Sequence, residues 1–245
     1  MDSLTMAAAS GMRSRIDSLD MLANNLANSS APGFKADREF YNLYVSQDAA
    51  DGNDGQSPVT APVIEKQWTD FSQGTLTPTS NPLDLAITGA GFFAVTSPSG
   101  TLFTRDGSFR LSPQGELQTQ EGYGVRDSNG NAIVLDPTKQ TDIRADGTLR
   151  QDGVDVGQIE VVDFNNPQSL VKQGQNYFFA DNGNTPLPAS QAEVQQGKLE
   201  SANFQTAESA VRLITVMRQF EGLQKAMSIA TDMNKKAVEE VARVD

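Results

Sequence analysis

Residues 4–27 read LTMAAASGMRSRIDSLDMLANNLA, and this stretch decides how the fold begins. It contains no proline, and its only glycine is Gly11. Apolar or small residues recur in alternating steps of three and four, the spacing of a helix seam that packs on another helix. The members of this seam are Ala9, Met12, Ile16, Leu19, Ala23 and Leu26, with Leu4 and Leu22 widening the stripe. The pattern predicts a long helix that ends between Asn24 and Ser30, before Pro32-Gly33.

The other end of the chain carries a matching pattern. Residues 204–241 lack proline and contain one glycine, Gly222. The same stepping is followed by Leu213, Val216, Phe220, Leu223, Met227, Ala230, Ala237 and Val241, and is interrupted at Asn234. Two long helices with narrow seams can bury those seams against each other. We therefore expect residues 1–30 and 204–245 to form one helical domain, with the two helices paired as a coiled coil.

The region between the helices indicates β structure. Tight-turn dipeptides recur at Asp106-Gly107, Asn129-Gly130, Asp146-Gly147, Asp152-Gly153 and Asn182-Gly183. Short alternating segments lie at 83–87, 109–111, 154–156 and 159–161. The spacing leaves no room for crossover helices, so the sheet should be antiparallel and mostly meandering.

These patterns give a fold class and a domain layout. The class is α+β, with a central antiparallel all-β domain at residues 75–199. Residues 31–74 should form a linker and extended segment. Within it, the polar, turn-rich stretch 46–60 is expected to be a mobile loop.

The composition excludes several kinds of function. Lys plus Arg number 19 and Asp plus Glu number 31, which gives a net charge of −12 and argues against nucleic-acid binding. The 245-residue chain has no cysteine and no histidine, so thiolate nucleophiles, disulfides, zinc-thiolate sites and imidazole proton shuttles are excluded. No apolar run is long enough to span a bilayer. The N-terminus is not typical of a cleavable signal peptide, so we expect either a cytoplasmic protein or export by another route.

One glycine-rich motif matches the sequence pattern of a dinucleotide-binding loop. Residues 89–94 match G-x-G-x-x-A after a probable strand. A nucleotide loop needs a helix to open at the second glycine, whereas residues 92–95 are strand-like. The motif is therefore interpreted as a hairpin turn between two strands.

Three other patterns are weak candidates for chemistry. Residues 127–131 begin like a calcium loop, but Ala132 and Thr138 occupy the positions that require glycine and glutamate. A type I′ hairpin at Asn129-Gly130 explains that stretch better. Ser169-Leu-Val-Lys172 matches S-x-x-K without its companion motifs. A carboxylate pair for glycoside hydrolysis remains open but nothing suggests one. We assign no catalytic, cofactor-binding or metal-ligating residue, and we expect no cofactor and no small-molecule substrate.

The two helix seams have two readings, an internal coiled coil or a contact between subunits. The rest of each helix mixes Ala, Ser, Asn, Gln and Met, which permit close helix packing. On these grounds subunit packing and internal packing are equally favoured. The candidate assembly residues are Met12, Ile16, Leu19, Leu22, Leu26, Leu213, Val216, Phe220, Leu223 and Met227.

Several stretches carry a family resemblance. Residues 23–35 (ANNLANSSAPGFK) resemble the N-terminal signature of flagellar axial proteins. Residues 73–95, 103–117, 197–204 (GKLESANF) and 218–221 (RQFE) are similar to the flagellar rod and hook members, in the expected order. The signature positions are Asn24, Asn25, Leu26, Ala27, Asn28, Gly33, Phe34 and Lys35.

The resemblance implies a self-assembling structural subunit of the bacterial flagellar basal body. Its implied partners are copies of itself, other flagellar rod proteins and the flagellar type III export apparatus. Subunits would stack head-to-tail into a hollow shaft that spans the periplasm, transmits torque and passes export substrates. The family is exported without a cleaved signal peptide. Early substrates carry a Phe-x-x-x-hydrophobic element that docks on the export gate, and Phe40 and Tyr44 lie where it is expected.

The chain's length and single modest β domain are most similar to the proximal rod protein, with the distal rod protein next and the hook protein less similar. One departure is Ala202-Asn203-Phe204, where relatives often have S-N-V. Two alternatives of other classes stay open. One is a secreted carbohydrate-active enzyme on the β domain, and the other is an adhesin or coiled-coil scaffold that forms a closed oligomer.

Overall fold

The computed structural model describes residues 3–45, 60–181 and 183–241. The chain forms two compact units. Unit 1 contains residues 1–27, 37–68 and 205–245, and unit 2 contains residues 28–36 and 69–204. The backbone therefore passes between the units at four places, after residues 27, 36, 68 and 204. Each unit is described by itself.

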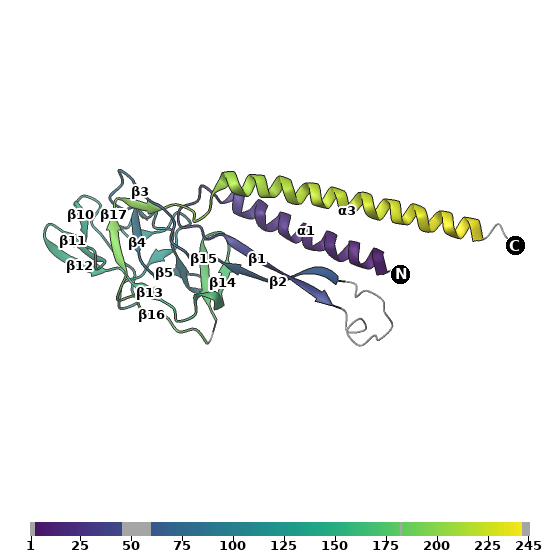
Figure 1. The fold of residues 1–245 in the computed structure, drawn as a ribbon. Coiled ribbons are helices and arrows are strands. Elements are labelled where there is room, and N and C mark those ends of the chain that lie inside the picture. Colours follow the sequence, from purple (N-terminus) through teal and green to yellow (C-terminus); the bar gives the residue numbers. More distant parts are fainter. Residues whose placement is uncertain (1–2, 46–59, 182, 242–245) are drawn as a thin grey trace. The chain divides into compact units, whose positions relative to one another are not determined.

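Unit 1 consists of two long helices and a two-stranded sheet (Figure 1). Helix α1 spans Ser3–Ala27 and helix α3 spans Thr206–Val241. Strands β1 (Asp37–Val45) and β2 (Thr60–Thr69) pair with each other. Glu208 lies in the first turn of α3, where a carboxylate interacts favourably with the helix dipole. Both predicted terminal helices are therefore present.

The phase of the predicted seam on α1 differs from the observed one. Ile16 is 45% exposed, and Ala9 and Ala23 are also exposed. The buried positions are instead Ser14, Ser18, Met21, Leu22 and Asn25. The Ser18 hydroxyl donates to the Ser14 carbonyl at 2.9 Å, so part of this buried face is polar and internally satisfied.

The contact between α1 and α3 is an apolar cluster at one end and involves a small residue of α1 further along. Met21 and Leu22 are buried with Val216, and Leu19 and Leu213 pack on them. Further along, a Cβ on Gly11 would lie 3.6 Å from Leu223 Cδ1. From one contact to the next, the residue number decreases on α1 and increases on α3, so the helices run antiparallel. Counting only apolar residues misplaced the seam, because small residues at 11, 14 and 18 occupy the buried face of α1.

Unit 2 is built from short antiparallel strands. The sheet at its centre follows the order β14-β15-β6-β5-β9-β8-β7, and β13 adds to β5 and carries β16. These strands are β5 (Phe92–Ser97), β6 (Gly100–Thr104), β7 (Arg110–Leu111), β8 (Leu117–Gln118), β9 (Gly124–Val125), β13 (Val161–Asp163), β14 (Leu170–Gln173), β15 (Tyr177–Ala180) and β16 (Leu187–Pro188). A 3₁₀ helix, η1 (Pro167–Ser169), precedes β14. The predicted antiparallel β domain and the α+β class are confirmed.

Three smaller sheets complete unit 2. One has the order β10-β11-β12, and the other two pair β17 with β4 and β18 with β3. Their bounds are β3 (Leu76–Pro78), β4 (Leu85–Thr88), β10 (Thr141–Ile143), β11 (Thr148–Gln151), β12 (Val154–Gln158), β17 (Glu193–Gln196) and β18 (Lys198–Glu200). The pairs β17–β4 and β18–β3 join strands more than 100 residues apart in sequence. The expected meander is therefore only part of the topology.

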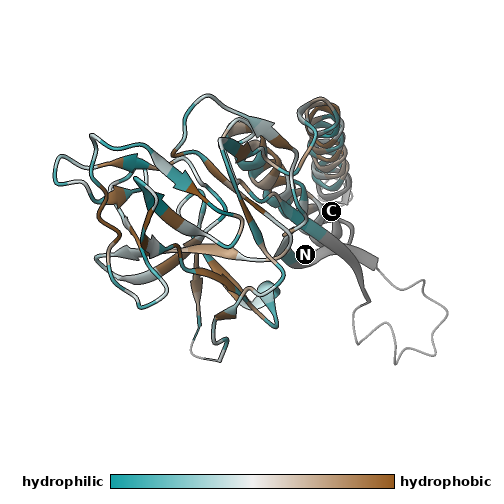
Figure 2. Cartoon of the chain, turned by 90° about the vertical axis from the view of Figure 1, so that its left-hand side faces the viewer, coloured by the Kyte–Doolittle hydropathy of each residue, from teal (hydrophilic) through white to brown (hydrophobic). Residues whose placement is uncertain are grey.

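The core of unit 2 has two clusters of buried side chains. The larger one includes Leu85, Ile87, Phe93, Leu117 and Leu149, all fully buried. The second is aromatic, with the rings of Phe92, Phe103, Phe164 and Phe178 in edge-to-face contacts. In Figure 2 the brown, apolar residues of this unit are concentrated on its strands. The β domain thus has a core of its own.

Two turn predictions need correction. The glycine-rich motif at residues 89–94 does not form a hairpin, because β4 pairs with β17 whereas β5 pairs with β6, β9 and β13. It connects two sheets instead. The turn at Asn129-Gly130 is not type I′, since Asp152 is the only non-glycine residue with positive φ in the described chain. The Gly130 amide donates to the Asp127 carbonyl and Gly130 has φ 85°, which is a type I turn followed by a bulge. The type I′ turn lies at Asp152-Gly153, between β11 and β12.

The segment predicted as a linker, residues 31–74, contains β1, β2 and residues 31–36, which belong to unit 2. The predicted mobile loop lies almost entirely at residues 46–59, outside the described residues. Among the described residues, no helix is long and apolar enough to cross a membrane.

Gly107 tests the packing of unit 2. A Cβ at this position would lie 1.8 Å from the Leu85 carbonyl oxygen, and φ is not in the left-handed region, so the obstacle is steric. We expect Gly107→Ala to lower the free energy of unfolding by about 3 kcal/mol. Urea denaturation followed by circular dichroism measures this change.

Gly157→Ala is the matched control, because a Cβ there would meet only Leu149 Cδ1 at 3.9 Å. Its free energy of unfolding should stay within about 0.5 kcal/mol of the parent value. Equal effects of the two substitutions would contradict the steric explanation.

Candidate assembly faces and a buried ion cluster

The inner face of α3 contains the predicted seam residues from Leu213 to Ala230, the part of the seam whose side chains the structure describes. Val216 is buried, and Leu213, Phe220, Leu223 and Met227 are half-buried. On α1, Leu22 is buried and Met12, Leu19 and Leu26 are half-buried, while Ile16 is exposed. A shallow hollow is lined by Met12 together with Met227 and neighbouring residues of α3. The structure thus brings most of the predicted set together within one chain, and their role between subunits remains a prediction.

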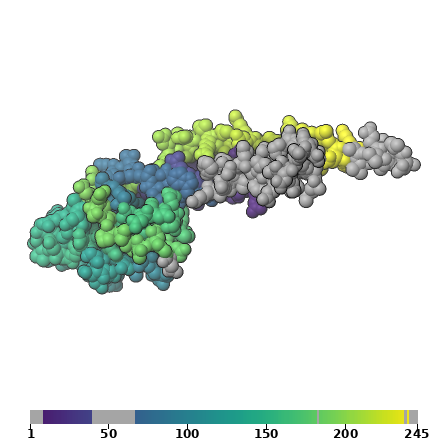
Figure 3. Space-filling view, turned by 60° about the horizontal axis from the view of Figure 1, so that its bottom comes forward, coloured from purple at the N-terminus to yellow at the C-terminus, as the bar shows by residue number. Residues whose placement is uncertain are grey.

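Five apolar side chains are exposed on the side of α3 away from Val216, where they alternate with charged residues such as Arg218 and Lys225. They are Val211 (66% exposed), Ile214, Met217, Ile229 and Met233 (66% exposed). At 3.6 residues per turn, Val211 and Ile229 project at the same angle, about 140° from the buried Val216. In Figure 2, apolar (brown) and polar (teal) residues alternate around α3. In Figure 3, which is coloured by residue number, the surface of α3 (yellow-green to yellow) is visible along much of the helix. We call these five residues the outward face of α3.

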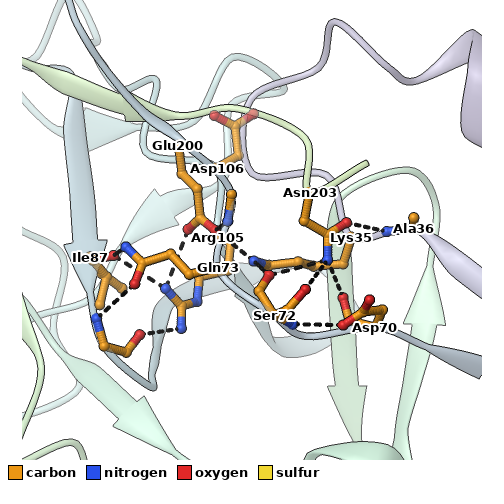
Figure 4. Close-up of polar contacts among 12 residues, drawn as sticks. Lys35, Ala36, Asp70, Ser72, Gln73, Ile87, Arg105, Asp106, Glu200 and Asn203 are labelled. Atoms are coloured by element: carbon orange, nitrogen blue, oxygen red, sulfur yellow. Dashed lines mark hydrogen bonds and ion pairs between the residues drawn. The ribbon is translucent and has the colours of Figure 1, made fainter. Parts of the chain in front are cut away.

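Unit 2 contains a buried ion cluster centred on Glu200 (Figure 4). Glu200 Oε1 accepts from Lys35 Nζ at 2.6 Å and from the Gly74 amide at 2.7 Å. Glu200 Oε2 lies 3.3 Å from Arg105 Nη1. The side chains of Lys35 and Glu200 are fully buried, and that of Arg105 is 4% exposed. One carboxylate therefore joins residues from three distant parts of the sequence.

The cations of this cluster are also held by backbone carbonyls. Lys35 Nζ donates to Ser72 O at 2.7 Å. Arg105 donates from Nη2 to Gly89 O at 2.6 Å and from Nη1 to Ile87 O at 3.3 Å. Burial lowers the pKa of Lys35 and of Arg105, and the nearby Glu200 carboxylate opposes that shift in both. The carboxylate thus stabilises two buried positive charges.

The predicted signature residues lie along the path from α1 into unit 2. Asn25 is buried, and its side-chain amide exchanges two hydrogen bonds with the backbone of Asp37. Asn28 is buried, Leu26 is half-buried, and Asn24 and Ala27 are exposed. Phe34 is fully buried, with the Phe204 ring 6.4 Å away in edge-to-face orientation. Gly33 has φ 68°.

Sequence reasoning missed Arg105, Glu200 and Asn203 as structural residues, although they lie inside the stretches that carry the family resemblance. Their sequence context gave no signal of burial. The predicted export element, Phe40 and Tyr44, lies in β1, and its side chains are outside the described part of the structure.

Ser169 and Lys172 do not form the pair that the S-x-x-K motif requires. Ser169 Oγ donates to Asn166 O, whereas Lys172 Nζ donates to Lys35 O, so each has another hydrogen-bond partner. No group of three acidic residues that could hold a metal occurs among the residues that were described. A hollow of about 470 Å³ beside β13 and β16 is lined mainly by apolar side chains, with Glu160 and Asp146 among its polar ones.

The ion cluster generates a stability prediction. Glu200→Gln leaves Lys35 and Arg105 buried without their carboxylate, so we expect unfolding to become easier by about 3–5 kcal/mol. Chemical denaturation of the purified chain measures the loss.

Glu160→Gln is the control, because Glu160 pairs with Arg126 at 2.8 Å but both side chains are about a quarter exposed. This substitution should cost about 1 kcal/mol or less. A Glu200→Gln protein as stable as the control would show that the cluster contributes little.

Comparison with known proteins identifies the family. The model described as "Flagellar hook protein FlgE/F/G D1 domain" matches residues 86–151, and "Flagellar basal body rod FlgEFG protein C-terminal" matches residues 195–240. The flagellar basal-body rod protein FlgF of Caulobacter vibrioides is 34% identical over 93% of each chain. FlgF of Mesorhizobium japonicum is 34% identical over 90% of each chain. FlgG of Bacillus subtilis is 30% identical over 94% of this chain and 95% of its own. The chain belongs to the flagellar basal-body rod protein family.

Proposed function

We propose that the chain is a structural subunit of the proximal flagellar rod, which assembles helically through its terminal helices into a hollow, torque-transmitting shaft. The observation that carries this proposal is the outward face of α3, which stays exposed although the opposite face of the helix is covered by α1. Identity to FlgF relatives is 29–34% and to FlgG relatives 28–33%, so these values are compatible with either position. The proximal position is proposed from the chain length and the single modest β domain. The distal rod is the second candidate, because those FlgG proteins match over 92% or more of this chain.

Packing energetics support a subunit contact at the outward face. Each of its side chains is half to two-thirds exposed, so covering one contributes about 1–2 kcal/mol. A contact between different faces of successive copies builds a filament when the rotation between copies does not close a ring, and this is the arrangement that we propose.

The proposal includes a coiled coil between α1 and α3. Support comes from the three-four spacing of Leu213, Val216, Phe220, Leu223 and Met227, which all lie on the covered side of α3. Gly11 allows a close approach of Leu223, which suits tight helix packing. In this arrangement the inner seam joins the helices of one copy, and the outward face joins copies.

Export by the flagellar type III apparatus without a cleaved signal is part of the proposal, as is location in the basal body across the periplasm. The proposed partners are copies of this chain and other rod proteins, with no nucleic acid and no small-molecule substrate. Deleting the gene and imaging basal bodies tests the position. The proximal assignment expects basal bodies without a completed rod, and intact rods with normal motility would refute it.

Phe40 and Tyr44 generate an export prediction. If they form the element that docks on the export gate, Phe40→Ala should reduce secretion of the chain into the periplasm several-fold, measured by immunoblotting of periplasmic fractions. Tyr41→Ala, beside the motif's two defining positions, is the control and should be secreted normally. Unchanged secretion of Phe40→Ala would exclude the docking role.

The outward face of α3 generates an assembly prediction. The double substitution Val211→Glu and Ile229→Glu places charges on this face with a residue that favours helices. The purified chain should keep its stability within about 1 kcal/mol, because both positions are exposed. In a deletion strain, the variant should fail to restore swimming in soft agar and should be absent from isolated basal bodies.

Val154→Glu is the matched control, since Val154 is 64% exposed on β12 of unit 2. It should restore swimming. Full motility of the double variant, with normal incorporation into basal bodies, would eliminate the outward face as the assembly contact.

A further inference from the structure

Residues 32–36 (Pro-Gly-Phe-Lys-Ala) end the stretch 28–36, which belongs to unit 2, although the chain before residue 28 and after residue 36 belongs to unit 1. The segment has no regular helix or strand structure. Gly33, Phe34, Lys35 and Ala36 are nevertheless buried. The residues that bury and bind it come from positions 70–74, 105–106, 172–176 and 200–204 of the same chain. Unit 2 therefore surrounds this segment as a protein surrounds a bound peptide.

The backbone of the segment is recognised at successive positions. Four of its carbonyls accept hydrogen bonds: Pro32 O from Asn176 Nδ2 at 3.0 Å, Phe34 O from the Asn203 amide at 3.4 Å, Lys35 O from Lys172 Nζ at 3.0 Å, and Ala36 O from the Asp70 amide at 2.9 Å. Two of its amides donate to residues beyond position 36: Gly33 N to Glu200 O at 2.7 Å and Ala36 N to Asn203 Oδ1 at 2.9 Å. Asn203 Nδ2 in turn donates to Asp70 O at 2.6 Å, which fixes the orientation of this side-chain amide.

Two side chains of the segment enter matched environments. Phe34 is fully buried, with Lys172 Nζ 4.5 Å from its ring centre and the Phe204 ring beside it. Lys35 reaches the Glu200 carboxylate and Ser72 O, as Figure 4 shows. An aromatic position followed by a cationic one is therefore specified by side-chain contacts.

Gly33 adds a steric requirement. Its φ of 68° is in the left-handed region, and a Cβ would lie 2.3 Å from the backbone carbon of Arg105 and the backbone nitrogen of Asp106. Only glycine permits this approach. The surroundings thus select a Gly-Phe-Lys sequence in one conformation.

We propose that unit 2 contains a peptide-binding site for a Pro-Gly-Phe-Lys-Ala segment with a left-handed glycine, occupied in this structure by residues 32–36 of the same chain. Docking of the segment is then a binding step, separable from the folding of the rest of unit 2. A peptide that carries the same five residues can replace the chain's own segment when that segment is weakened.

Full-length Lys35→Ala protein provides the test. The variant weakens the chain's own segment, while Glu200 retains its partner Arg105, so no buried carboxylate is left alone. A fluorescently labelled peptide of residues 28–37 is added, and binding is followed by fluorescence anisotropy. We expect saturable binding to the variant and at least about tenfold weaker binding to the parent chain, whose own segment competes. The peptide should also raise the Tm of the variant, because a ligand that binds the folded state stabilises it.

Peptides with single substitutions are the controls. Replacing lysine by alanine at the position of Lys35, or glycine by alanine at the position of Gly33, should weaken binding about tenfold or more, because a charged hydrogen bond or an allowed backbone conformation is lost. A substitution at the position of the exposed Ser30 should leave the affinity unchanged.

Full-length Phe34→Ala is a second host in case Lys35→Ala does not fold, since it leaves the ion cluster intact. Absence of peptide binding to a host that is folded by circular dichroism would overturn the proposal. Equal binding of the parent and substituted peptides would overturn it as well.

Discussion

The structure of unit 2 depends on the burial of a single carboxylate. Glu200 has no exposed surface and lies against two cations and a backbone amide that come from residues 35, 74 and 105. A buried carboxylate is costly unless such partners are in place, and the buried cations are equally costly without the carboxylate. This mutual requirement fixes where β18 lies relative to β3, and it holds residues 33–36 and 72–74 against the centre of the unit. The regular sheet pairing then extends from these points.

Assembly into a rod requires surface that other copies can cover, whereas the fold of unit 2 requires a core of its own. The chain belongs to the flagellar rod protein family, and α3 has one face covered by α1 and an outward face that is exposed. Unit 2 has two apolar clusters of its own and does not need neighbours to exclude water from them. Exposed apolar side chains occur on α3 and also on unit 2, for example at Val134, Val154 and Val171, and the proposed assembly uses those on α3.

Local features were predictable from sequence where local physics determines them. The helix at Ser3–Ala27 begins one residue before the predicted stretch 4–27 and ends at the same residue, because its spacing and its flanking turn residues act over a few positions. The pairs Asn129-Gly130, Asp146-Gly147 and Asp152-Gly153 lie at turns, whereas Asp106-Gly107 does not. The turn type predicted at Asn129-Gly130 was wrong, since one φ angle distinguishes the alternatives. The phase of the α1 seam was wrong because Ser14 and Ser18 carry no apolar signal. The pairing of β18 with β3 could not be predicted from sequence, because it joins residues 76–78 and 198–200. It also depends on charged side chains whose burial no local pattern reveals.

The four places where the backbone passes between the units have a mechanical consequence. A domain tethered by one linker can rotate about it, and any torque on the domain is transmitted through that single linker. Here a load applied to unit 1 is divided among four backbone connections, after residues 27, 36, 68 and 204. Two of these connections flank residues 28–36, whose backbone is hydrogen-bonded by Lys172, Asn176 and Asn203. In the proposed torque-transmitting rod, stress on unit 1 would therefore be shared among four covalent connections.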